Sequence, residues 1–226
     1  LNHIIAPNLS FKNFFELSKK LNIQNIEIRN DLPKICFEKT NSDEIKRLVD
    51  EYDIKILTIN ALQKFNIWNK EREEELLFLC QFAKKCGIKT ILLVPLNTGE
   101  FVNKIERIDL LNNSLGNINK ILNDYDLFGY VEPLGFKISS LRYKSEVVES
   151  LDKLSSNSNL KILHDTFHHY LAGEDIIYPD LTGLVHISGV TDTSVSTDKL
   201  TDDSRVLIDK NDVIQNVEQI VKLRAA

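Results

Sequence analysis

The feature that most constrains the fold is a repeated alternation of short β-rich runs with longer amphipathic segments. Seven runs predict strands, because they are apolar, rich in Ile, Leu and Val, and bounded by polar residues. The predicted strands are residues 3–6, 25–29, 54–60, 90–94, 127–132, 160–165 and 181–187. Strands that alternate with helices indicate a parallel sheet joined by helical crossovers.

The segments between these runs predict helices with recognisable ends. Ser10 is suited to cap the first helix, Asn41 or Ser42 the second, and Gly87 to stop the third. Asp209 or Asn211 lies where a cap of the last helix is expected. After the helix that begins at Ser10, the predicted helices are residues 42–52, 70–86, 103–124, 141–154 and 209–224.

The whole chain, residues 1–226, is predicted to be a single domain, because no linker rich in Gly, Ser or Pro divides it. A doubly wound sheet and a (β/α)8 TIM barrel are the two architectures to weigh. The chain has only 8 glycines and no phosphate-binding glycine motif, which favours the barrel. A closed barrel needs an eighth strand, and we therefore expect the natural protein to continue beyond Ala226.

Composition excludes several classes of protein. The 28 basic and 33 acidic residues give a net charge of −5, which argues against nucleic acid as a partner. No apolar run reaches the ~20 residues of a membrane span, and no signal peptide is recognisable. Three cysteines without CxxC spacing indicate reduced thiols, so we expect a cytoplasmic protein. The oligomeric state is left open by the sequence, and a homo-oligomer is one possibility.

Chemistry in a parallel barrel lies at the carboxyl ends of the strands. Glu132, Asp165 and His186 end three consecutive predicted strands, so they are expected to converge at one mouth. Two carboxylates and an imidazole suit one divalent ion, such as Mn2+, Zn2+, Co2+ or Mg2+. We predict a metal site of these three residues, although each residue alone would more often be structural.

His168 follows Asp165 by three residues, so a helical turn would direct both side chains to the mouth. It is predicted either to orient a metal ligand or to donate a hydrogen bond to substrate. Glu27, Asn60 and Asn97 lie at the ends of other predicted strands and are candidates for substrate binding.

Six motifs together resemble the xylose isomerase-like TIM barrel superfamily, and in particular the sugar phosphate isomerases and epimerases linked to myo-inositol catabolism. The motifs are residues 27–31 (EIRND), 58–62 (TINAL), 95–97 (PLN), 131–142 (VEPLGFKISSLR), 164–169 (HDTFHH) and 185–193 (VHISGVTDT). The resemblance extends over essentially the whole chain, and residues 131–193 are its most specific part.

The resemblance implies metal ligands at Glu132, Asp165 and His186, a substrate or metal-shell contact at His168, and a substrate contact at Arg142. The family's fourth ligand, a glutamate on the eighth strand, has no counterpart in this sequence.

The leading hypothesis is a metal-dependent isomerase or epimerase of a small sugar or inosose, working through an enediolate with Glu132 as base and His168 as a second catalytic residue. The alternatives are an inosose dehydratase and a non-catalytic sugar-binding barrel. An apurinic endonuclease is disfavoured by the five histidines and the negative charge.

Overall fold

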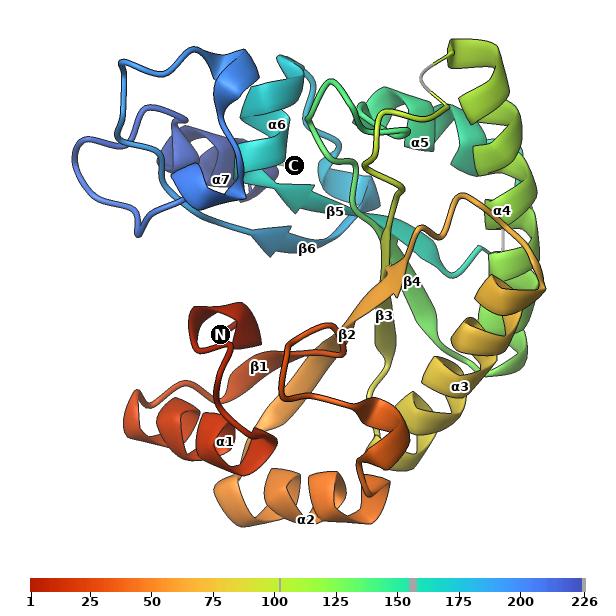
Figure 1. Cartoon of the computed structure of the whole chain (residues 1–226), viewed down its shortest axis with the longest axis vertical. Coiled ribbons are helices and arrows are strands. Elements are labelled where there is room, and N and C mark those ends of the chain that lie inside the picture. Colours follow the sequence, from red (N-terminus) through yellow and green to blue (C-terminus); the bar gives the residue numbers. More distant parts are fainter. Residues whose placement is uncertain (102, 155–157, 225–226) are drawn as a thin grey trace.

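The computed structural model describes residues 1–101, 103–154 and 158–224 and contains a six-stranded parallel sheet. The strands pair in chain order and curl into a half-barrel, with α1–α5 along its outer face (Figure 1). β1 and β6 form the two edges of this sheet. The strands are β1 Asn25–Arg29, β2 Lys55–Gln63, β3 Thr90–Val94, β4 Phe128–Val131, β5 Leu160–Asp165 and β6 Thr182–His186. The predicted α/β barrel class is thus confirmed, in the form of a curled half-barrel.

The helices are α1 Phe11–Lys20, α2 Ser42–Tyr52, α3 Lys70–Cys86, α4 Lys104–Asp124, α5 Lys144–Leu151, α6 Thr166–Ala172 and α7 Asn216–Arg224. Several predicted ends are confirmed. Ser10 caps α1, Asn41 caps α2, and Gly87 ends α3 in the left-handed conformation at φ 72°. No helix in the described ranges is both long and apolar enough to cross a membrane.

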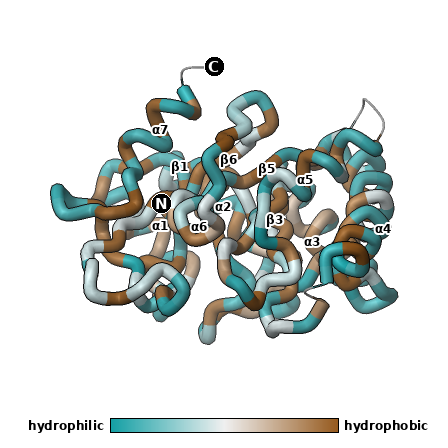
Figure 2. The backbone as a smooth tube through the Cα atoms, turned by 90° about the horizontal axis from the view of Figure 1, so that it is seen from above, coloured by the Kyte–Doolittle hydropathy of each residue, from teal (hydrophilic) through white to brown (hydrophobic). Residues whose placement is uncertain are grey.

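Alternation along each strand separates two apolar layers. Residues such as Ile91, Leu93 and Val131 face the helices and belong to the main core. Leu92, between Ile91 and Leu93, faces the inside of the barrel, as does Leu163 on β5. Both pack there with Ala61. Figure 2 shows hydrophilic and hydrophobic residues alternating along the outer helices, as expected when one helix face covers a sheet.

Three predicted elements differ from the structure: residues 3–6, 141–154 and 209–224. Residues 3–6 are not a strand: His3–Ile5 is a short 3-10 helix, and only Asn2 pairs with Glu27 in a parallel bridge. The side chain of Asn2 accepts the N–H of Ile4 and so starts a turn, while the His3 ring stacks on Phe14 at 4.2 Å. The sheet therefore has six strands where seven were predicted.

The last helix begins at Asn216, not at Asp209 or Asn211. Residues before it form turns, because Asp209 accepts the N–H of Asn211 and Gln215 has φ 61°. Asp212 accepts the N–H groups of Val190 and Asn216, which ties this loop to the chain after β6. The predicted helix 141–154 is likewise shorter, spanning Lys144–Leu151.

Candidate metal centre

Glu132 is the first residue after β4, and it continues the pairing with β3 because its N–H donates to the carbonyl of Leu93 at 3.0 Å. Tyr130 packs with the inner apolar layer, so the pleat also turns Glu132 inward, two residues later. The side chain is buried, with 6% of the residue exposed. A carboxylate in this position needs a cationic partner.

Asp165 ends β5 and caps α6. Its Oδ1 accepts the N–H groups of Phe167 at 2.8 Å and His168 at 3.2 Å, while Oδ2 accepts the Nη2 of Arg205 at 2.6 Å. The residue is 3% exposed. Burial opposes ionisation, but His168, the Arg205 guanidinium and His186 favour the charged carboxylate and lower the pKa of Asp165.

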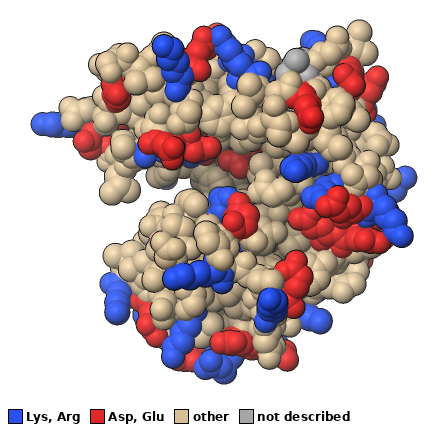
Figure 3. Space-filling view, viewed as in Figure 1, with Lys and Arg blue, Asp and Glu red and all other residues tan. Residues whose placement is uncertain are grey.

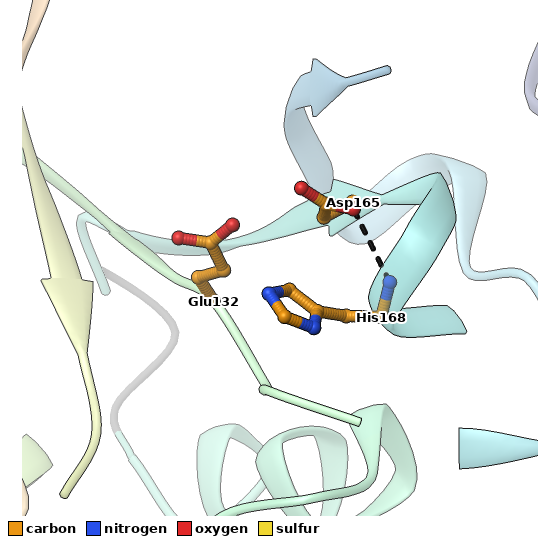
Figure 4. A group of neighbouring side chains, drawn as sticks. All are labelled: Glu132, Asp165 and His168. Carbon is orange, nitrogen blue, oxygen red and sulfur yellow. Dashed lines mark hydrogen bonds between the residues drawn. The ribbon is translucent and has the colours of Figure 1, made fainter. Parts of the chain in front are cut away.

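The first turn of α6 brings His168 beside the two carboxylates. Glu132, Asp165 and His168 each offer a ligand atom, and these atoms lie within 4.8 Å of one another. Figure 4 shows the His168 ring directed toward Glu132, with the capping bond from its own N–H to Asp165. All three side chains are buried.

His186, at the end of β6, lies against the same carboxylates. Its Nδ1 is 3.3 Å from Oε1 of Glu132 and 3.9 Å from Oδ2 of Asp165. The residues predicted as metal ligands therefore lie together, and His168 joins them. The assignment of His186 as the metal-binding histidine, with His168 orienting a ligand or contacting the substrate, stays a prediction.

Glu27 closes the group from the opposite edge of the sheet. Its Oε2 is 3.0 Å from Nε2 of His186, although the two residues lie on the two edge strands. Asn60 donates to Oε1 of the same carboxylate at 2.9 Å. Burial would lower the pKa of His186, but the charge of Glu27 and the hydrogen bonds to both glutamates raise it well above the ordinary value. The imidazolium then donates to Glu27 and Glu132 at once.

The molecule is hollowed between the lobe that carries β6 and α7 and the lobe that carries β1 and α1, and acidic side chains are visible inside the hollow (Figure 3). Two of the predicted substrate-binding residues, Asn60 and Asn97, each have a buried amide oxygen that meets no hydrogen-bond partner in the described residues. Asn60 is 2% exposed, and Asn97 follows β3 in a half-buried position.

Arg142, predicted as a substrate contact, is bound to main-chain carbonyls. Its Nε donates to Gly135 and its Nη2 to Leu171, both at 3.0 Å, so it joins the loop after β4 to α6. The two segments touch closely: a Cβ on Gly135 would lie 2.2 Å from the carbonyl oxygen of His168. Glycine is therefore required where the loop meets the helix.

Arg205 is a site residue that sequence reasoning missed. Besides Asp165, it binds Oγ of Ser188 at 2.8 Å, and its guanidinium lies 4.9 Å from the centre of the Phe167 ring. It comes from an irregular loop 40 residues after Asp165, and no motif in the sequence marks it.

The donor set fits a divalent ion. Carboxylate oxygens from Glu132 and Asp165 and an imidazole nitrogen suit Zn2+, Mn2+ or Co2+, and a carboxylate-rich set also accommodates Mg2+. The burial of three carboxylates, Glu27, Glu132 and Asp165, in one cluster supplies the negative charge that a cation would neutralise.

Comparison with known proteins places this chain in a family. The model of the "Xylose isomerase-like TIM barrel" family matches residues 15–225, and the chain belongs to that family. A xylose isomerase domain containing protein from Salmonella typhimurium LT2 is 33% identical, with a TM-score of 0.89, and the match covers 100% of this chain and 83% of that one. No curated protein sequence matches the chain significantly.

Two more distant structures share the fold. An IolI protein with a bound zinc atom is 21% identical at a TM-score of 0.84, and the match covers 99% of this chain and 82% of that one. A D-psicose 3-epimerase determined in the presence of D-fructose is 17% identical at a TM-score of 0.63, covering 84% and 72%. The family includes sugar isomerases and epimerases.

Proposed function

We propose that this protein is a metal-dependent isomerase or epimerase of a small, uncharged sugar or inosose. The observation that carries the proposal is the buried group of Glu132, Asp165 and His168, whose ligand atoms lie within 4.8 Å of one another at the mouth of the half-barrel. The zinc atom in the IolI structure and the sugar named with the epimerase structure support a metal and a carbohydrate in this fold.

Glu132 and Asp165, with His168 or His186, are the residues that would hold the ion. A bound divalent ion would act as a Lewis acid toward the substrate's oxygens and stabilise negative charge that develops there. Glu132 is the proposed base that removes the proton next to the substrate carbonyl, giving an enediolate. His168 donates to a substrate oxygen or orients the ligand set, and Glu27 and Asn60 accept and donate hydrogen bonds at the substrate hydroxyls.

The cations around the site support an uncharged substrate over a phosphorylated one. Arg29 donates to both carboxylate oxygens of Asp31, at 2.8 and 2.6 Å. Arg205 binds Asp165, and Arg142 binds main-chain carbonyls. The amino end of α6, which would otherwise attract an anion, is already capped by the Asp165 carboxylate. Each of these donors has an acceptor, so a phosphate would compete for donors already engaged.

The first experiment measures metal content and turnover. We expect purified protein to bind Mn2+ or Zn2+ stoichiometrically and to exchange the substrate's α-proton for deuterium in heavy water. Glu132→Gln should lower turnover at least ~100-fold while the protein stays folded, because the change keeps the volume but removes the base. Glu149→Gln, an exposed glutamate on α5, is the matched control and should leave turnover unchanged.

The outcomes separate the alternatives. Loss of water with formation of an unsaturated product would identify a dehydratase. Tight sugar binding without exchange of the α-proton would identify a binding barrel. A near-normal rate in Glu132→Gln would remove Glu132 from the mechanism. For the substrate class, a free sugar should react at least ~10-fold faster than its phosphate ester at equal concentration, and the reverse order would contradict the argument from the paired cations.

A further inference from the structure

One ring nitrogen of His168, Nδ1, is buried and lacks a hydrogen-bond partner among the described residues. Figure 4 shows one ring nitrogen facing Glu132 and the other directed away from both carboxylates. The aromatic rings of Phe136 and Phe167 lie 5.1 and 5.4 Å from the His168 ring centre, so these neighbours supply no acceptor. A buried N–H without an acceptor is costly, and such groups are normally satisfied by protein or ordered water.

A small cavity adjoins this ring. Its volume is about 10 Å³, close to the minimum for a single water molecule. Besides His168 and Asp165, the lining includes Lys144, His169 and Glu174, so the cavity is polar as well as narrow. A polar cavity with several donors and acceptors favours a hydrated state over an empty one.

Lys144 and Glu174, which both line this cavity, also contact each other. Nζ of Lys144 lies 3.4 Å from Oε2 of Glu174 and also contacts Nδ1 of His169. Glu174 in turn accepts the main-chain N–H groups of Lys144 at 2.9 Å and Ser145 at 3.1 Å, at the start of α5. Lys144 is 3% exposed, which is rare for a lysine. Burial, only partly offset by Glu174, lowers the pKa of Lys144 to about 8.

We infer that the cavity binds one ordered water that links Lys144 to Nδ1 of His168, which makes Lys144 a positioning residue for the metal centre. The water accepts hydrogen bonds from Nδ1–H of His168 and from the Lys144 ammonium, and it donates to Glu174. This arrangement holds the proton on Nδ1 and leaves the lone pair of Nε2 directed toward Glu132 and Asp165. A histidine that binds a metal commonly has its other nitrogen fixed in this way.

Only the expected effect on metal affinity rests on the proposed metal site. The test therefore has two readouts, of which the first does not depend on metal. The first is the tautomer of His168 in metal-free protein, measured from ¹⁵N chemical shifts. We expect the Nδ1–H form in the wild type and a mixture of tautomers in Lys144→Met. The second is Mn2+ affinity by titration, which Lys144→Met should weaken ~10-fold to 100-fold. Lys153→Met, at an exposed lysine just past α5, should change neither.

A double variant distinguishes positioning from a general structural effect. In a His168→Gln background, Lys144→Met should have no further effect on Mn2+ affinity, because the group that it positions is gone. If Lys144→Met fails to fold, Glu174→Gln, which keeps the shape but weakens the acceptor, should show the same changes at smaller size.

The results also separate the two proposals. No Mn2+ binding by the wild type would overturn the proposed function, while the tautomer would still test the water. An unchanged tautomer in folded Lys144→Met, or an equal loss of affinity with and without His168, would overturn the inference. A high-resolution crystal structure without density in the cavity would do the same.

Discussion

The two sides of the half-barrel are stabilised differently. The side built from α1, β1, α2 and β2 packs apolar and aromatic side chains such as Phe14, Phe15 and Phe65, all fully buried. The side from β5 to α7 has a second apolar cluster of five buried residues, and polar contacts surround it. There Thr166 binds Asn216 at 2.6 Å, and His164 binds Gln219 at 2.8 Å.

This difference shows where the chemistry is placed. The aromatic side contributes Glu27 and Asn60 to the mouth but otherwise supports the fold. The polar side carries Asp165, His168, His186 and Arg205, whose positions depend on directional hydrogen bonds. Such networks specify geometry, but a single change that leaves a buried partner unsatisfied is costly.

The largest expected effect compares one buried phenylalanine from each side. Phe14→Ala and Phe167→Ala should each lower the free energy of unfolding by about 3–5 kcal/mol, because both leave a cavity. Only Phe167→Ala should also weaken Mn2+ binding, since its ring contacts His168 and Arg205. Urea unfolding and metal titration measure the two effects, and equal metal affinities would contradict the division between the sides.

The second prediction compares two arginine ion pairs. Arg205→Met removes the cation closest to the buried Asp165 carboxylate and should destabilise the metal-free protein by about 3 kcal/mol. Arg47→Met breaks an exposed pair with Glu51 on α2 and should cost less than about 0.5 kcal/mol. Chemical denaturation in the presence of a chelator checks both values. A small effect at Arg205 would show that the capping hydrogen bonds and the neighbouring histidines suffice to hold Asp165.

The third prediction concerns pH. Burial and the nearby Lys144 charge lower the pKa of His164 to about 4, against about 6.5 in an unfolded chain. The unfolded state therefore binds more protons between pH 4 and 6.5, and stability falls as the pH decreases through this window. The loss reaches at most about 3 kcal/mol, and His164→Gln should reduce the slope. Identical slopes for the variant and the wild type, measured with chelator present, would refute the assignment.

The smallest effect probes the main apolar core, which the aromatic side shares with α3, with a thiol reagent. Burial raises the pKa of Cys80 to about 12 and of Cys86 to about 11, so neither forms a reactive thiolate near neutral pH. Cys36 is half-buried and lies before a short 3-10 helix. We expect one thiol per chain to react at pH 8 in the native protein and three in urea. Equal labelling rates at Cys80 and Cys36 would show that this core opens readily.

The sequence predicted the sheet and much of the site because both depend on local pattern. Alternation along the strands turned Glu132, Asp165 and His186 to one side, and their distances confirm that they lie together. The error at residues 3–6 has a local cause as well, because the Asn2 side chain starts a turn that an apolar run did not indicate.

Arg205 and the pair of Lys144 and Glu174 were not predictable in this way. Arg205 reaches Asp165 from 40 residues along the chain, and Glu174 meets the start of α5 from 30 residues away. These contacts depend on how irregular loops fold back on the sheet, and neither strand alternation nor helical spacing encodes that path.

The close contact between Gly135 and α6 has a consequence for motion. The backbone of the loop after β4 lies directly against the helix, and Arg142 joins both segments by hydrogen bonds to their carbonyls. Local opening of one segment must therefore break the other, so the two form a single cooperative unit of hydrogen exchange. Their slowest amides would share one opening free energy. Glu132, just before the loop, and His168, on the helix, would then lose their geometry in the same fluctuation.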